Sequence, residues 1–417
     1  MPLDLDRLIA KTRPRSSPRR EDGRLVILRC GLGRDSITML ALLVEKGLVA
    51  GGRIIRAKDV DAVVFTDTGA EWPHTYALIP RVRAFCERHG LRFIVQATPP
   101  REGPNGWAAW LRWQVTERAR IRAKTGNPKA KLPGGLVPAW RRQRPQTIEA
   151  RAESGYYHRR APIIDDYRSR AALILKGGGG DCTENHKILP SREMMQDLAI
   201  ERFGAWATND AWGEAVLAGR RQPHLVLLGI AADEAGRARE VDPRASSTPF
   251  EENRYPLVEM GIEKPMEGAI LARHGFADAR KSGCYACKYQ DRSWYWALLV
   301  LEPALFAKVE EWEASSVARA GPRMSLFPAS RSALVRGHPN PILAEWKREG
   351  WAWERVTDKE KDKDQIVAFI PLREQVRRWR LANPDAELEE VMAKEYRKDC
   401  PAGSAARGRG GRQLALW

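Results

Sequence analysis

The chain has 417 residues, enough for one large domain with insertions or for two to three smaller domains. Hydrophobic residues make up 43% and charged residues 29%, which excludes a wholly disordered chain, a collagen and a disulfide-stapled miniprotein. Lysine and arginine (70) outnumber aspartate and glutamate (53), so the formal net charge is +17 and a polyanionic partner is expected.

Hydropathy and cysteine usage indicate a cytoplasmic protein. No run reaches the roughly 18 apolar residues of a membrane helix, and the first residues lack the apolar core of a secretory signal. Six cysteines are too few for a disulfide framework in so long a chain, and a close pair in a reducing compartment points to metal or redox chemistry. Only Cys284 and Cys287 form such a pair, whereas Cys30 and Cys86 are expected to be buried small hydrophobic residues.

Alternating apolar runs and helical patterns predict an α/β fold from residue 24 onward. Short β-branched runs predict strands at 25–30, 61–67, 91–97 and 224–230. Helical patterns predict helices at about 35–46, 73–89, 233–239, 293–301 and 303–319. This order of elements predicts a doubly wound, Rossmann-like parallel sheet with helices on both faces.

A strongly basic insertion at 98–181 interrupts this pattern. It holds 17 Lys and Arg against 7 Asp and Glu, more than half of the excess positive charge of the chain. A structureless loop of that length is rare in a compact domain, so helices are expected at about 105–124 and 146–153, with flexible joints at 128–138. The tryptophans in this stretch could stack on bases or anchor a core, and they are Trp107, Trp110, Trp113 and Trp140.

Composition divides the chain into four parts. Residues 1–23 are expected to form a basic flexible arm, 24–320 the α/β domain with its insertion, 321–402 a mainly helical C-terminal region, and 403–417 a flexible basic tail. Within the third part, 371–396 predicts two helices, and the KEKDKD run at 359–364 predicts a solvated turn.

The sharpest motif is GLGRDS at 31–36, which follows a predicted strand and opens a predicted helix. Its two glycines allow backbone N–H groups to approach an anion closely, and the helix N-terminus adds the positive end of its dipole. The motif lacks the GxxxxGK[ST] pattern of kinase-type phosphate loops. A glycine turn between strand and helix is common, so phosphate binding is one interpretation and a simple turn is the other.

Together with FTDTGAEWPHTY at 65–76, this loop resembles the phosphoadenylylsulfate (PAPS) reductase-like branch of the N-type ATP pyrophosphatases. Three further segments occur in that family's order: CTENHKILP at 182–190, LGIAADEAGR at 228–237, and YPL at 255–257 followed by KSGCYAC at 281–287. The resemblance covers residues 24–300. It implies an adenine-nucleotide alpha hydrolase-like fold and an enzyme that binds ATP and Mg²⁺ and releases pyrophosphate.

The chain departs from the family pattern at several positions. Gly31 stands in place of the loop's usual serine, Leu32 in place of its first glycine, and Lys288 in place of a proline that often follows the cysteine pair. The ECGxH segment of true sulfonucleotide reductases is absent, and Cys400 in KDCPAG does not match it. The changes in the loop remove one hydroxyl donor to pyrophosphate, and the absent ECGxH segment argues against reduction of PAPS.

The resemblance assigns roles to the matched residues. The loop residues that would hold the phosphates are Gly31, Leu32, Gly33, Arg34, Asp35 and Ser36, with Asp35 also fixing the loop or placing Mg²⁺. The residues that would line the nucleotide crevice are Asp67, Thr68 and Gly69. The residues that would act on the leaving pyrophosphate are Lys187 and Arg237, with Asp233 and Glu234 orienting them or holding metal. Without the resemblance, Asp67 is a turn former or helix cap, and the acidic pair is a solvated helix start.

Cys284 and Cys287 lie in GCYAC, where the preceding glycine suits a tight turn that directs two thiolates toward one ion. The resemblance makes Cys182 the third ligand of a [4Fe–4S] cluster with one open iron, as in the tRNA thiolation enzymes of the superfamily. Zn²⁺ with His186 or His274 as fourth ligand, a redox pair, and reduced structural thiols are the alternatives.

The leading prediction is an enzyme that uses ATP to adenylate a nucleic acid, held by the basic insertion, with release of pyrophosphate. Attack by sulfur carried on the cluster, or by another nucleophile, would follow. Two further partners are compatible with this prediction: a protein that donates the sulfur, and a second copy of the chain in a homodimer. The alternatives are a PAPS-type reductase and a nucleic-acid-binding protein with a regulatory or vestigial nucleotide site, whose binding would be salt-sensitive.

Overall fold

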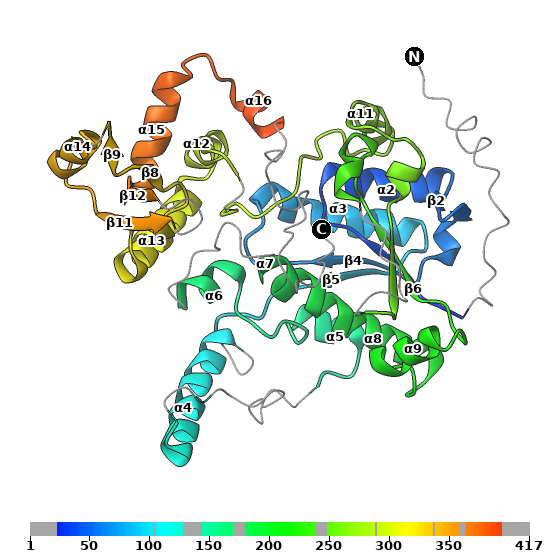
Figure 1. Cartoon of the computed structure of the whole chain (residues 1–417). Helices are drawn as coiled ribbons and strands as arrows, with labels where there is room; N and C mark the ends of the chain where they lie inside the picture. The colour runs from blue at the N-terminus through cyan, green and yellow to red at the C-terminus, as the bar shows by residue number, and fades with distance from the viewer. Residues whose placement is uncertain are drawn as a thin grey trace. The chain divides into compact units, whose positions relative to one another are not determined.

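The computed structural model describes residues 23–102, 106–127, 130, 144–169, 181–238, 248–287, 290–336, 338–358 and 363–393 (Figure 1). The chain forms two compact units, one of residues 1–162, 180–283 and 402–417 and the other of residues 163–179 and 284–401. The expected basic arm, the joints at 128–138 and the basic tail lie outside the described residues, apart from residues 23 and 130.

A five-stranded parallel sheet forms the centre of the first unit. Its strands are β1 (Val26–Arg29), β4 (Ala62–Thr66), β5 (Phe93–Gln96), β6 (His224–Leu228) and β7 (Glu251–Arg254). Their order is β5-β4-β1-β6-β7, and every neighbouring pair is parallel. The four predicted strands and the α/β class are therefore confirmed. β7 was not predicted, because its residues, EENR, are polar.

Helices cover both faces of this sheet. Successive side chains of a strand point to opposite sides, so Val26 and Leu28 pack on one face while Leu25 and Ile27 pack on the other. The first face is covered by α2 (Arg34–Glu45), α3 (Pro73–Arg88) and α11 (Lys264–Arg273). The second is covered by α5 (Ile148–Glu153), α8 (Leu189–Phe203) and α9 (Asn209–Leu217). Cys30 and Cys86 are buried in the first core, as predicted.

The remaining elements of the first unit are short, except for α4. They are the hairpin β2 (Leu48–Ala50) and β3 (Arg53–Ile55), η2 (Ala57–Asp59), α4 (Trp107–Thr125), α7 (Asp181–Thr183), η4 (Glu184–Ile188), η5 (Ala232–Arg237) and α10 (Pro256–Glu259). Helices α4 and α5 confirm the two helices predicted in the insertion. The helix predicted at 233–239 is instead a short 3₁₀ helix, η5, in which Glu234 has non-helical backbone angles.

The second unit combines helices with antiparallel strands. Its helices are α6 (Ile163–Ser169), α12 (Arg292–Leu301), α13 (Pro303–Ala320), η6 (Pro322–Met324), α14 (Ile342–Arg348), α15 (Leu372–Ala382) and α16 (Leu388–Ala393). Its strands are β8 (Ala329–Ser332), β9 (Leu334–Val335), β10 (His338–Pro339), β11 (Trp353–Asp358) and β12 (Lys363–Ala368), and they form a three-stranded sheet, β11-β12-β8, and a hairpin, β9–β10.

The C-terminal region therefore differs from the mainly helical one that was expected. At least half of the residues in each strand of this sheet are polar and the apolar ones do not alternate regularly, so the strands were not predicted. Trp346 is buried against Ile366 and Ala368 of β12, Trp351 packs against the same cluster, and Trp353 is exposed. The boundary between the two units lies between residues 283 and 284, not near residue 320. In the described part of the chain, every helix is too short or too polar to cross a membrane.

Candidate functional site

The carboxyl ends of three neighbouring strands meet at one edge of the first unit. β4, β1 and β6 are adjacent and parallel, so the segments that follow Thr66, Arg29 and Leu228 all emerge at that edge. The strand order reverses between β1 and β6, and open parallel sheets bind their ligands at such a reversal. The candidate site is therefore the edge formed by these three strand ends.

The loop at 31–36 joins β1 to α2 at this edge. Gly33 caps the helix: its N–H donates to Ser36 Oγ (3.2 Å), and the Ser36 hydroxyl donates to the Gly33 carbonyl (3.0 Å). Leu32 has a left-handed backbone, with φ 58°, and a fully buried side chain. A leucine is strained in this conformation, and burial of its side chain offsets the strain. The predicted order of strand, tight loop and helix is confirmed.

A second segment, residues 280–283, lies against this loop. The N–H of Arg34, the first residue of α2, donates to the carbonyl of Arg280 (3.2 Å). A Cβ atom on Gly33 would lie 2.5 Å from Ser282 Oγ and 2.8 Å from Ser282 N, so only glycine fits there. A Cβ atom on Gly31 would lie 3.4 Å from Ser282 Oγ. Two N–H groups that a phosphate could use, those of Gly33 and Arg34, thus have partners inside the chain.

Gly229, directly after β6, packs against the same helix start. A Cβ atom on this glycine would lie 2.9 Å from both the backbone N and the Cα of Ser36. Glycine is required here because the end of β6 approaches the first turn of α2 so closely. The residue belongs to the LGIAADEAGR segment, but the sequence alone did not distinguish it from the other glycines.

Acidic side chains gather beside the first turn of α2. Glu267 of α11 is fully buried, and its Oε2 lies 3.6 Å from Nε of Arg34. Burial raises the pKa of Glu267 to about 8, with a further contribution from the nearby charge of Asp35. A carboxyl group that is protonated near neutral pH can lie beside Asp35 without adding a second full negative charge. No pattern in the sequence pointed to Glu267.

Asp233 and Glu234 contact the start of α11. Glu234 Oε1 accepts a hydrogen bond from Nζ of Lys264 (2.6 Å), and Asp233 Oδ1 accepts one from the Lys264 backbone N–H (3.4 Å). The side chain of Arg237 lies outside the described residues. The role assigned to this acidic pair toward Lys187 and Arg237 therefore stays a prediction, while its contact with α11 is observed.

The segment after β4 forms a tight turn around Asp67. Asp67 Oδ1 accepts hydrogen bonds from the N–H of Gly69 (2.7 Å) and from the hydroxyl of Tyr76 (2.8 Å). Gly69 has φ +73°, and a Cβ atom there would lie 2.5 Å from Cβ of Pro162. Asp67 is thus a turn former, the role expected for it without the resemblance. It lies at the same sheet edge as the 31–36 loop.

Glu71 connects three of the sequence motifs. It is almost completely buried, its Oε1 accepts a hydrogen bond from the Thr68 hydroxyl (3.0 Å), and the same oxygen lies 3.8 Å from Nζ of Lys187. Its carboxyl also accepts a hydrogen bond from the backbone of Gly283. Burial raises the pKa of Glu71 against the opposing effect of the Lys187 charge. Segments 65–76, 182–190 and 281–287 therefore meet at one buried carboxyl group.

Lys187 lies on a π-helical turn. This turn, η4, continues without a break from α7 into α8. A π-helical turn changes the direction of the side chains it carries, and such turns are frequent at functional sites. The sequence identified Lys187 as a candidate, but it did not reveal the π-helical turn or the ion pair with Glu71.

The paired cysteines lie on one turn of the second unit. The Cys287 N–H donates to the Cys284 carbonyl (3.1 Å), and the Tyr295 hydroxyl donates to the Cys287 carbonyl (3.0 Å). Cys182 belongs to α7 of the first unit. Among the described residues, no three His, Cys, Asp or Glu side chains are grouped so that they could hold a metal ion. The three-cysteine cluster therefore stays a prediction.

A scan against models of protein families, a search of curated proteins and a search of solved structures each found no match. The geometry of the site is therefore the basis for a functional proposal. Four residues that sequence analysis did not select prove central to this edge, namely Glu71, Gly229, Glu267 and Ser282. Three of them, Glu71, Gly229 and Ser282, lie inside segments that resemble the family, within a few positions of a predicted site residue.

Proposed function

We propose that the first unit binds ATP at the carboxyl edge of its parallel sheet and transfers AMP to a nucleic acid, with release of pyrophosphate. An oxygen of the nucleic acid attacks the α-phosphorus, a new P–O bond forms, and the bond to the pyrophosphate oxygen breaks. The resemblance to ATP pyrophosphatases and the basic insertion motivate this reaction. AMP is then a good leaving group for a following nucleophile.

One observation carries the proposal: the segments that resemble this family converge although they are far apart in the sequence. Gly229 packs on Ser36, Ser282 packs on Gly33, and Glu71 contacts both Lys187 and the backbone of Gly283. Chance matches scattered along a chain have no reason to meet at one edge of a sheet. That edge is also where open α/β sheets bind nucleotides.

The chain's own residues supply the functions that adenylation needs. The N-terminus of α2 attracts phosphate through its dipole, and Lys187 can neutralise charge as pyrophosphate departs. Mg²⁺ is commonly held by one or two carboxylates together with substrate phosphates, and we assign this role to Asp35. Glu71 accepts a hydrogen bond from the Thr68 hydroxyl and forms an ion pair with Lys187, so it can position the Lys187 ammonium group.

Release of radiolabelled pyrophosphate from ATP, together with transfer of labelled AMP to added RNA or DNA, tests the proposal. We expect Asp35→Ala to abolish both products while the protein stays folded. Asp210→Ala is a matched control, because Asp210 occupies the same second position of a helix, α9, at a distance from the site in the sequence and fold. Absence of both products from the unmodified protein with every nucleic acid tried would refute the reaction.

A second candidate function is a nucleic-acid-binding protein whose nucleotide site is vestigial. The observation in its favour is that the N–H groups of Gly33 and Arg34 already donate within the chain. It predicts nucleic-acid binding without ATP turnover, and full binding by the Asp35→Ala variant. Equilibrium binding of labelled ATP separates the two functions, since the adenylating enzyme binds ATP and a vestigial site does not.

Sulfur is one nucleophile that could displace the AMP, and its delivery would depend on a cluster held by Cys182, Cys284 and Cys287. Iron and zinc analysis of protein purified without oxygen, with its visible absorption spectrum, tests the cluster directly. A brown protein that loses its colour in Cys284→Ala supports sulfur transfer. A colourless zinc protein points to a structural site, and a metal-free protein to a redox pair or to structural thiols.

A further inference from the structure

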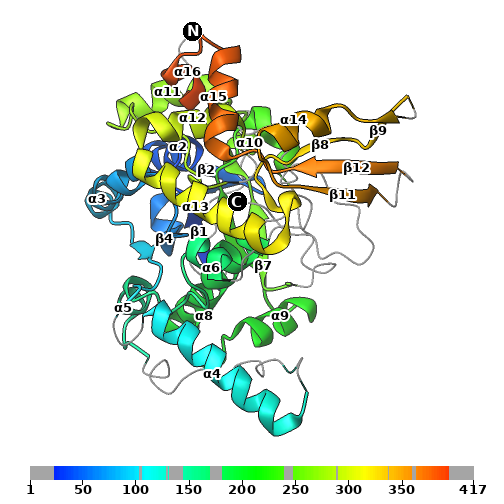
Figure 2. The ribbon, with the colours of Figure 1, turned by 90° about the vertical axis from the view of Figure 1, so that its left-hand side faces the viewer.

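Helix α4 is unusual because almost none of it is buried. It runs for 19 residues, and Trp110 is its only buried residue among those described. Val115 is 68% exposed. In both views α4 lies at the margin of the first unit, away from the central sheet (Figures 1 and 2). A helix of this length normally gains its stability by burying an apolar face, so a long exposed helix suggests a partner.

The charge of α4 indicates the chemistry of that partner. The helix carries five basic residues and a single acidic one, Glu117, which pairs with Arg120 at 3.2 Å. The other basic side chains are all exposed and make no ion pair with the described part of the chain; they are Arg112, Arg118, Arg122 and Lys124. Four cations therefore extend into solvent from one helix.

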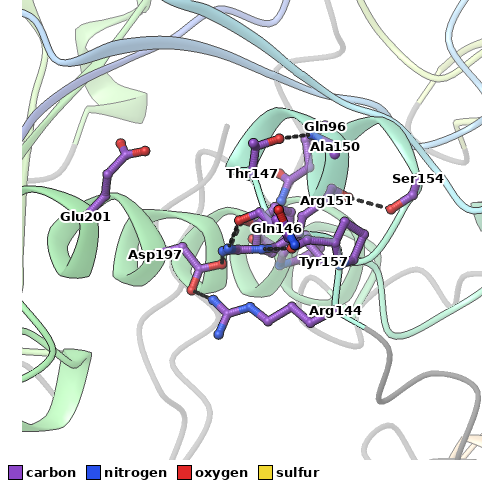
Figure 3. A network of polar contacts seen from close by, with 12 residues as sticks. Gln96, Arg144, Gln146, Thr147, Ala150, Arg151, Ser154, Tyr157, Asp197 and Glu201 are labelled. Atoms are coloured by element: carbon purple, nitrogen blue, oxygen red, sulfur yellow. Dashed lines mark hydrogen bonds and ion pairs between the residues drawn. The ribbon is translucent and has the colours of Figure 1, made fainter.

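The rest of the described insertion differs, because several of its arginines form ion pairs. Figure 3 shows Arg144 and Arg151 reaching Asp197 of α8, which also accepts a hydrogen bond from the Tyr157 hydroxyl (2.8 Å). Arg159 pairs with Glu193 of the same helix. These arginines attach the insertion to the first unit. The unpaired positive charge of the described insertion is thus concentrated on α4.

The distribution of these charges favours a nucleic acid over a membrane surface. A helix that lies on a membrane has one broad apolar face and one basic face. On α4, basic residues occur on several sides, and Val115 is its one large apolar side chain that is exposed. The half-buried rings of Trp107 and Trp113 could stack on bases beside the cations.

We infer that α4 is the element that binds the phosphate backbone of the nucleic acid, through Arg112, Arg118, Arg122 and Lys124. This inference deepens the substrate part of the proposed function and rests on it for the reaction that follows binding. Each arginine that contacts a phosphate displaces counterions, so binding weakens steeply with salt. Contacts of this kind are independent of base sequence.

Fluorescence anisotropy with mixed-sequence RNA and DNA of about 30 nucleotides, without ATP and over a range of salt concentrations, tests the inference. We expect the triple variant R112Q/R118Q/R122Q to bind at least about tenfold more weakly. The negative slope of log K against log salt should become shallower by about 2. The variant R112K/R118K/R122K keeps the charges, so it should keep most of the salt dependence.

A charge-matched control removes three exposed arginines elsewhere, as R88Q/R220Q/R319Q. This control lowers the net charge equally and should leave the slope nearly unchanged. Equal weakening by both triple variants would mean that net charge alone drives binding, and it would overturn the inference. The inference is also overturned if the α4 variant binds nucleic acid normally but no longer binds phosphatidylserine vesicles. Circular dichroism confirms that each variant is folded.

The two proposals fail in different ways. If the α4 variant still binds nucleic acid and the protein still releases pyrophosphate with it, only the role of α4 is wrong. If α4 governs binding but no nucleic acid elicits pyrophosphate from ATP, only the adenylation reaction is wrong.

Discussion

At the scale of single residues, the candidate site is held together by close packing against backbone atoms. Gly33 and Gly229 both lie where a Cβ atom would collide with backbone, of Ser282 and Ser36 respectively. Leu32, between Gly31 and Gly33, has a left-handed backbone that glycine would adopt without strain. Here a leucine adopts this conformation, and the burial of its side chain holds the loop in place.

We expect Gly33→Ala to lower the unfolding free energy by about 1–3 kcal/mol, because its methyl group must displace the backbone at Ser282. The same change should weaken ATP binding, since it separates segment 280–283 from the loop. Chemical denaturation and equilibrium binding of labelled ATP measure the two effects. Gly268→Ala is the control: Gly268 lies in α11 with open space around its Cβ position, so alanine should stabilise it slightly. An equally stable Gly33→Ala protein would contradict this packing argument.

Glu267 should make the stability of the first unit depend on pH. Its pKa is raised from 4.5 to about 8 in the folded protein, chiefly by burial. The folded state therefore binds the proton more tightly than the unfolded state does, and this contribution to stability is lost as pH rises from about 4.5 through about 8.

We expect Glu267→Gln to remove this part of the pH dependence and to be more stable than the unmodified protein at pH 9, by up to about 5 kcal/mol. At pH 5 the two should be nearly equal. Urea denaturation at both pH values gives the comparison, with Glu153→Gln, an exposed glutamate of α5, as control. If Glu267→Gln shows the same pH profile as the unmodified protein, the carboxyl is not protonated in the folded state.

At the scale of elements, α8 has two functions that its sequence does not separate. Its first residues continue the π-helical turn that carries Lys187, and its middle residue Asp197 binds the arginines of the insertion. Asp197 is itself buried, so its charge needs these partners. One helix therefore links the candidate site to the segment at 144–157.

We expect Asp197→Ala to destabilise the first unit by about 3 kcal/mol, because Arg151 and the Tyr157 hydroxyl lose a buried partner. Cleavage within 144–157 by trypsin should become faster. Glu193→Ala removes the partner of Arg159, which is 71% exposed, and should cost less than about 1 kcal/mol. Limited proteolysis followed by mass spectrometry compares the variants, and equal cleavage rates would argue against the anchoring role.

At the scale of the whole molecule, the chain is divided between residues 283 and 284. The segment that packs on the 31–36 loop, 280–283, is therefore followed immediately by the cysteine pair of the second unit. Each unit has its own buried core, with Trp212 in the first and Trp312 in the second. Cores that are separate can open separately.

We expect Trp212→Ala, which costs about 3–5 kcal/mol, to raise amide hydrogen exchange across the first unit and to leave the second largely unaffected. Trp312→Ala should do the reverse. Hydrogen exchange measured by mass spectrometry resolves the two patterns. A uniform increase along the chain in both variants would show that the two units unfold together.

Four strands, the strand–loop–helix around residues 31–36 and the helices α2, α3, α4 and α5 could be predicted from the sequence, whereas α8, α9 and α11 were not predicted. The side chains of the predicted elements repeat with the period of the element, and glycine marks the turn, so the information is local. The polar strand β7 and the strands of the C-terminal region were not predicted, because their apolar residues do not alternate clearly with polar ones. The turn-forming role of Asp67 was equally local and could be anticipated.

By itself, the sequence determined the class of the first unit, the position of a glycine loop before a helix, and the location of the excess positive charge. Only the tertiary structure decided that Glu71 joins Lys187 to Gly283, that Ser282 packs on Gly33, and which basic residues of the insertion stay unpaired. The physical reason is distance along the chain. Periodicity and turn preferences act between neighbours, whereas ion pairs and close packing join residues separated by a hundred or more positions, which only the folded chain brings together.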